Sequence, residues 1–122
     1  MPILQYYALY EGIRLAFEEG LEKRWARHED AGRYFQQQMR ERGYTFLSDP
    51  EHQLWELSAI DVPDGVGGKQ VQTRILREFA IEVGGGLGPT APPIWRVGLM
   101  GVNANRDAAD RVLAAFDAVL PR

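Results

Sequence analysis

A single arginine lies inside an apolar run that closely follows a cluster of glycines. Residues 81–89 read Ile-Glu-Val-Gly-Gly-Gly-Leu-Gly-Pro, and residues 94–101 read Ile-Trp-Arg-Val-Gly-Leu-Met-Gly. This pattern predicts a strand, a glycine-rich turn and a second strand. Side chains alternate along a strand, so Arg96 and Gly98 are expected on the face opposite to Trp95 and Val97.

The chemistry of Arg96 depends on what neutralises its charge. An arginine among apolar residues needs an anionic partner, because an isolated buried charge is costly. Gly98 has no side chain and is expected to leave room beside the guanidinium. The partner is either a carboxylate of the chain itself or the carboxylate of a substrate, which the planar fork of arginine suits. The residue types alone leave both alternatives open.

The glycines between the two apolar runs predict a tight connection with positive φ angles. A phosphate-binding loop is less favoured, for two reasons. No Gly-Lys-Ser/Thr follows the glycines, and no helical pattern begins directly after them.

These two segments closely resemble the C-terminal domain of class V pyridoxal-phosphate aminotransferases, nearest to the alanine–glyoxylate and serine–pyruvate branch. The resemblance continues through residues 21–28 and 103–105, so it covers essentially the whole chain. It implies that Arg96 binds the substrate carboxylate of an amino or keto acid. It also implies that Gly85, Gly86 and Leu87 form a loop at the substrate mouth. The intact enzyme would carry pyridoxal 5′-phosphate and form a homodimer.

The sequence positions of the two lysines indicate that the chain is only part of such an active site. Pyridoxal phosphate is held by a desolvated lysine. The chain has Lys23 in a charged helical stretch and Lys69 in a glycine-rich break, and neither matches the Schiff-base lysine of the family. We therefore expect no catalytic residue and no bound cofactor in this chain, which would be inactive alone. A large cofactor-binding domain or a second subunit would complete it.

Bulk composition sets further limits. The chain has 122 residues, no cysteine and a net charge of −3, which predicts one small domain without disulfides and no nucleic-acid partner. His28 and His52 lack metal-ligand spacing, so no metal site is expected. No apolar run is long enough to span a bilayer and no signal peptide is apparent, so we predict a cytoplasmic protein without membrane contact.

Periodicity predicts an α+β fold, a two-layer sandwich of helices on a small, mostly antiparallel sheet. We expect helices over 3–19, from 21 to about 42, around Val71–Phe79, and after an N-cap at Asn105. Strands are expected over 44–47, 54–62, 81–83 and 94–99. His28 lies on the apolar stripe of the second helix and is expected to be a hydrogen-bonded core or rim residue. The charged side chains opposite that stripe, including Arg27, are expected to be solvated.

The first helix is unusually rich in aromatic residues. Residues 1–19 are expected to form an interdomain or interface helix, and residues 20–122 the two-layer core. The apolar content predicts a helix buried on most of its circumference. It packs either on this domain's own sheet or on a partner subunit or missing domain.

Two other functions remain open from the sequence. The chain could be a non-catalytic module that senses a small carboxylate or dimerises, because two-layer sandwiches serve many roles. It could also be a truncated fragment without independent activity.

Overall fold

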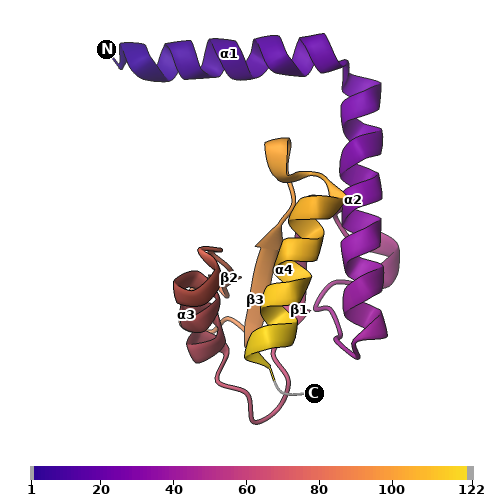
Figure 1. Cartoon of the computed structure of the whole chain (residues 1–122), viewed down its shortest axis with the longest axis vertical. Coiled ribbons are helices and arrows are strands. Elements are labelled where there is room, and N and C mark those ends of the chain that lie inside the picture. The colour runs from indigo at the N-terminus through magenta and orange to yellow at the C-terminus, as the bar shows by residue number, and fades with distance from the viewer. Residues whose placement is uncertain (1, 121–122) are drawn as a thin grey trace.

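The computed structural model describes residues 2–120. This part of the chain contains four helices, two short 3₁₀ turns and three strands. In chain order they are α1 (Ile3–Glu19), α2 (Leu21–Glu41), η1 (Pro50–His52), β1 (Leu57–Asp61), α3 (Gly68–Phe79), β2 (Gly84–Gly85), β3 (Ile94–Gly98), η2 (Gly101–Asn103) and α4 (Arg106–Val119) (Figure 1).

Strand β3 is the centre of an antiparallel sheet with the order β1-β3-β2. Arg96 therefore stands between Ala59 of β1 and Gly84 of β2. Helices lie against one face of this sheet, and the predicted α+β two-layer sandwich is confirmed.

The core lies between the helices and the face of β3 that carries Trp95. Trp95 is fully buried; its ring centroid lies 5.2 Å from that of Phe116 in α4, and its Nε1 donates to the Gly68 carbonyl over 3.0 Å. Phe35 and Met39 of α2 are also fully buried in this cluster. The alternation predicted for residues 94–99 is confirmed, with the odd-numbered side chains inside.

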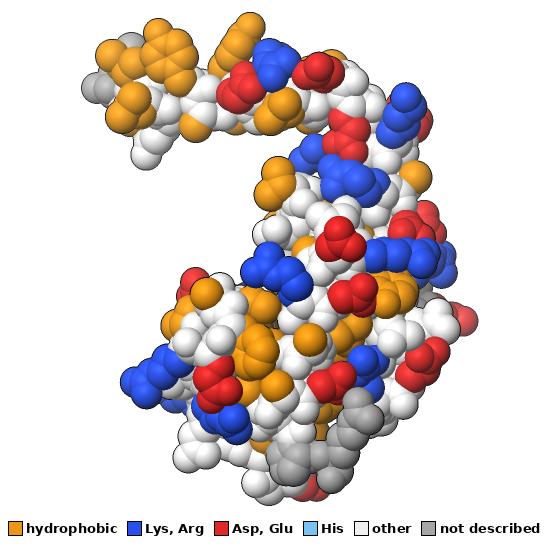
Figure 2. All heavy atoms as spheres, in the orientation of Figure 1, with side chains coloured by type: hydrophobic (Ala, Val, Ile, Leu, Met, Phe, Trp, Pro, Cys, Tyr) orange, Lys and Arg blue, Asp and Glu red, His pale blue; other side chains and the backbone are white. Residues whose placement is uncertain are grey.

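Helix α1 projects from the rest of the molecule as an arm (Figure 1). The chain turns at Gly20, whose φ of 85° favours glycine, and α1 contains no buried residue. Tyr7 is 70% exposed and Phe17 is 77% exposed, and apolar side chains run along the arm in Figure 2. The expectation that this helix is buried on most of its circumference is wrong for this chain, and α1 does not pack on the sheet.

The strand boundaries differ from those predicted. Residues 81–83 are not a strand, and two of the glycines expected in the connection, Gly84 and Gly85, form strand β2 by pairing with β3. The expected positive φ is found at Gly88, at 82°. Residues 44–47 make only an isolated bridge, from Phe46 to Ile60. The strand expected over 54–62 begins at Leu57, after the Trp55 backbone has packed against Gly32 of α2.

Ala80 ends α3 in the left-handed region, with a φ of 54°. An L-residue is strained there, so Ala80→Gly should raise the free energy of unfolding by up to about 1 kcal/mol. Ala114→Gly, at an exposed interior position of α4, should lower it by about the same amount. Urea denaturation of both variants checks the prediction, which fails if the two changes have the same sign.

Candidate functional site

Arg96 lies on the face of the sheet that the helices leave open. Its side chain is half-buried, and its Nε donates to the Gly85 carbonyl over 2.6 Å. Within residues 2–120 no acidic side chain forms an ion pair with Arg96, and neither Nη nitrogen makes a hydrogen bond. The structural ion pair, one of the two alternatives from the sequence, is therefore not present in the described part of the chain.

The hydrogen bond to Gly85 orients the guanidinium while leaving its terminal nitrogens available. Arginine binds a carboxylate best through two parallel N–H donors. A guanidinium held at Nε by a backbone carbonyl has lost part of its rotational freedom before any ligand arrives. The arrangement can bind one planar anion.

The predicted loop lies beside Arg96 only in part. A Cβ on Gly84 would lie 3.5 Å from Arg96 Cβ, Nε and Nη2, so β2 runs along the arginine side chain. A Cβ on Gly86 would come within 2.7 Å of Ala91 Cβ and 2.9 Å of the Pro92 carbonyl oxygen, so Gly86 allows the loop to fold back on itself. Leu87 is exposed at its tip.

The space expected at Gly98 is occupied by another part of the chain. A Cβ on Gly98 would lie 3.2 Å from Met100 Cε. Because Gly98 shares the face of Arg96, the end of the Met100 side chain lies on that face too. Met100 thus forms a wall over Gly98, two residues along β3 from Arg96 on the same face, which the sequence did not indicate.

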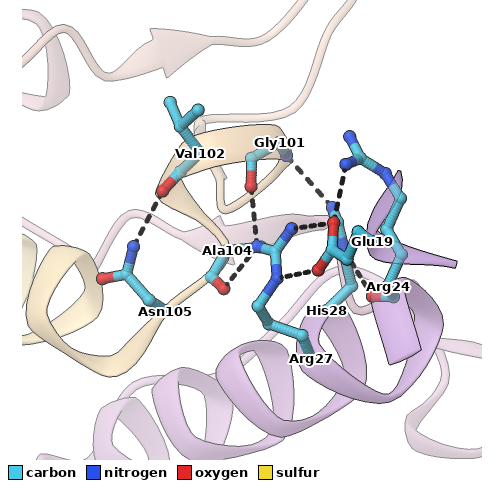
Figure 3. A network of polar contacts seen from close by, with 8 residues as sticks. All are labelled: Glu19, Arg24, Arg27, His28, Gly101, Val102, Ala104 and Asn105. Carbon is cyan, nitrogen blue, oxygen red and sulfur yellow. Dashed lines mark hydrogen bonds and ion pairs between the residues drawn. The ribbon is translucent and has the colours of Figure 1, made fainter. Parts of the chain in front are cut away.

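The chain bends at Gly20, between α1 and α2, and this bend forms an elbow. A polar cluster joins the elbow to the turn that follows β3 (Figure 3). Glu19 accepts hydrogen bonds from Arg27 Nε over 2.6 Å, from Arg27 Nη2 over 2.9 Å and from Arg24 Nη1 over 3.0 Å. These bonds, chiefly those from Arg27, lower the pKa of the Glu19 carboxyl to about 2. The carboxylate therefore remains ionised unless the pH falls toward that value.

Arg27 and His28 both reach the turn from α2. Arg27 Nη1 donates to the Gly101 carbonyl over 2.8 Å and to the Ala104 carbonyl over 2.9 Å. The Gly101 N–H donates to His28 Nε2 over 3.0 Å, so Nδ1 carries the proton that it shares with the Arg24 carbonyl. The expectation of a hydrogen-bonded core or rim histidine is confirmed. The expectation that Arg27 is simply solvated is wrong.

Helical spacing alone did not reveal this role for Arg27. The cluster depends on the turn of the chain at Gly20, which brings Glu19 back toward α2. Its other end lies 74 residues away in sequence, in a turn that has no periodicity. The one available signal was a glutamate directly before a glycine that separates two helical patterns.

The surroundings of the lysines and of the potential metal ligands can be compared with what a cofactor or a metal requires. Lys23 and Lys69 are both exposed on helices, which does not fit a Schiff-base site that needs a desolvated amine. No group of three or more potential metal ligands occurs within residues 2–120. No helix among those residues has the length and apolar character needed to cross a membrane.

A cleft of about 340 Å³ opens where β3 and the segment before β2 separate. Glu82, Gly98 and Arg111 are among its lining residues, but Arg96 is not. The cleft is therefore distinct from the open fork of Arg96.

The known proteins similar in sequence that we compared are aminotransferases. No family model matches the chain. It is 38% identical over 117 residues to an alanine–glyoxylate aminotransferase of Rattus norvegicus, covering 95% of this chain and 28% of the relative. It is 35% identical over 116 residues to an (S)-ureidoglycine–glyoxylate transaminase of Bacillus subtilis, with coverage of 95% and 28%.

Solved structures show the same relationship in three dimensions. An alanine–glyoxylate aminotransferase from Nostoc sp. superposes with a TM-score of 0.92 and 42% identity, covering 98% of this chain and 32% of that one. The ureidoglycine–glyoxylate aminotransferase of Bacillus subtilis superposes with a TM-score of 0.88 and 35% identity, with coverage of 93% and 30%. The chain thus spans less than a third of the length of these relatives.

Proposed function

We propose that this chain, a homologue of the class V pyridoxal-phosphate aminotransferases that matches the small domain of their fold, supplies the substrate-binding arginine of a transaminase. The observation that supports the role most directly is the geometry of Arg96. Its Nε is held by the Gly85 carbonyl, while its Nη nitrogens face no internal carboxylate among residues 2–120. The substrates would be alanine or serine with glyoxylate or pyruvate.

In this proposal Arg96 binds and orients the substrate carboxylate. Holding one end of an amino acid at a fixed fork limits the directions in which its Cα–H bond can point. Pyridoxal phosphate, when bound in the intact enzyme, supplies the electron sink for that carbon. The lysines of this chain do not fit its attachment, so the cofactor site is assigned to the rest of the enzyme.

The exposed arm α1 is proposed to contact that remainder. Large apolar side chains such as Tyr7 and Phe17 favour burial, and the matched relatives are about three times as long as this chain. The large domain or a second subunit of a homodimer would cover the arm. A cytoplasmic location stays a prediction from the sequence.

Arg96→Lys in the intact enzyme tests the proposal. A lysine keeps the charge but loses the fork, so the KM for glyoxylate or pyruvate should rise about tenfold. Steady-state kinetics with each keto acid measures the change. Arg77→Lys is the control, because Arg77 is an exposed arginine on α3. An unchanged KM for both the amino and keto substrates in Arg96→Lys would refute the assignment.

The alternative of a carboxylate-sensing module makes a different prediction. Titration calorimetry of the 122-residue chain with glyoxylate should then show saturable binding. In our proposal half of the pocket is contributed from elsewhere, so the isolated chain should release no measurable binding heat.

A further inference from the structure

The turn after β3 carries Met100, the residue that forms the wall over Gly98 on the Arg96 face of the sheet. It begins where the Leu99 N–H donates to the Glu56 carbonyl and passes through Gly101, whose φ is 62°. Between them, the Met100 side chain extends back over Gly98 on the arginine face. The position of Met100 therefore depends on what holds this turn.

Side chains of helix α2 hold the turn through hydrogen bonds to the backbone of the turn. Arg27 binds the Gly101 and Ala104 carbonyls through a single nitrogen, Nη1. His28, the next residue, accepts the Gly101 N–H. Both polar backbone groups of Gly101 are thus bonded to consecutive side chains of α2 (Figure 3). Gly101 directly follows Met100, the residue that forms the wall.

The opposite edge of the Arg27 guanidinium, formed by Nε and Nη2, binds the elbow through Glu19. Arg27 Nε and Nη2 donate to the two carboxylate oxygens of Glu19, the last residue of α1. Glu19 directly precedes Gly20, where the direction of α1 is set. One side chain, Arg27, therefore connects the direction of the exposed arm to the turn beside Arg96.

We propose that Arg27 is a positioning residue that couples the α1 elbow to the substrate face, by holding Met100 over Gly98 on the face that carries Arg96. The inference rests on the proposed function, since it takes the Arg96 face to be the substrate face. When α1 contacts the rest of the enzyme, its direction is transmitted through Glu19 and Arg27 to the turn at Gly101. Arg27 touches no substrate in this arrangement; it acts through Met100.

The test compares Arg27→Gln with Arg74→Gln in the intact enzyme. Arg74 is a matched control, because it also binds one carboxylate, Glu78, and one backbone carbonyl, that of Val119, but it lies on α3. We expect Arg27→Gln to raise the KM for the keto acid about tenfold and Arg74→Gln to leave it unchanged. Arg27→Lys, which keeps a charge for Glu19 but cannot bind both partners through a fork, should fall between wild type and Arg27→Gln.

A double-mutant cycle with Met100→Ala separates positioning from general destabilisation. If Arg27 acts through Met100, adding Arg27→Gln to Met100→Ala should change KM by less than about twofold. Hydrogen exchange of the peptide spanning residues 99–104, followed by mass spectrometry, should be faster in Arg27→Gln than in Arg74→Gln.

Three outcomes would contradict, in turn, the positioning role of Arg27, its action through Met100, and the proposed function of Arg96. Faster exchange with an unchanged KM in Arg27→Gln, in an enzyme where Arg96→Lys raises KM, overturns the positioning role and leaves a structural clamp. Additive effects in the cycle overturn the route through Met100. An unchanged KM in Arg96→Lys instead refutes the proposed function itself, so the two failures are distinguishable.

Discussion

Replacing Gly32 with alanine should destabilise the chain by roughly 2–3 kcal/mol, as overpacking of a dense core does. Gly32 lies in the middle of α2, where it faces the backbone of Trp55. An added Cβ would lie 2.4 Å from the Trp55 carbonyl oxygen and 2.7 Å from its Cα. Backbone atoms cannot rotate away as a flexible side chain can, so the helix must move outward. Urea denaturation followed by circular dichroism measures the loss.

Gly12 provides the matched control for this substitution. It also lies inside a helix, α1, but a Cβ there would meet nothing within 4 Å. Alanine favours a helix over glycine by about 1 kcal/mol, so Gly12→Ala should raise the helical content without lowering the denaturation midpoint. If Gly32→Ala costs no more than Gly12→Ala, then α2 does not approach Trp55 as described.

Periodic patterns predicted the core of this protein well. The stripe predicted for α2 placed Phe35 and Met39 inside, but Leu21 and Trp25, at its N-terminal end, are exposed. The alternation of residues 94–99 placed Trp95 inside and Arg96 on the opposite face. Burial follows from the local pattern because each element has one apolar side. The N-cap at Asn105 is also confirmed, since its Oδ1 accepts from the Ala108 N–H over 2.8 Å.

Features that depend on contacts between distant segments were not predicted. Periodicity showed that α1 is helical and apolar, but not that it stands apart from the sheet, because an apolar helix is equally compatible with either placement. Glycines normally weaken strands. Here Gly84 and Gly85 nevertheless form one, because their backbones pair with Arg96 and Trp95 of β3.

In the candidate site, too, local patterns predicted the residue and its face, but not its contacts with distant segments. Residue type and alternation identified Arg96 and the face it occupies. The hydrogen bond that orients it comes from Gly85, in a strand that the sequence placed elsewhere. The wall at Met100 and its connection through Arg27 to Glu19 link segments more than 70 residues apart, and no local pattern encodes them.

Trp95→Ala should cost about 3–5 kcal/mol, the range for removing a large buried aromatic side chain. Trp95 is fully buried, its ring centroid lies 5.2 Å from that of Phe116 and 6.4 Å from that of Tyr44, and its Nε1 is bonded to the Gly68 carbonyl. The substitution opens a cavity between β3 and α4 and leaves the Gly68 carbonyl without its donor. Urea denaturation of the chain measures the decrease in the free energy of unfolding.

Trp95→Phe separates the two contributions. It keeps an aromatic ring in the core but loses the donor to Gly68, so its cost should be smaller, about 1–2 kcal/mol. The substitution also bears on the site, because burial of residue 95 sets the register that places Arg96 on the open face. An enzyme carrying Trp95→Phe should therefore keep its KM for the keto acid while its midpoint falls. A rise in KM comparable to that of Arg96→Lys would show that the packing of Trp95, and not register alone, sets the direction of the Arg96 fork.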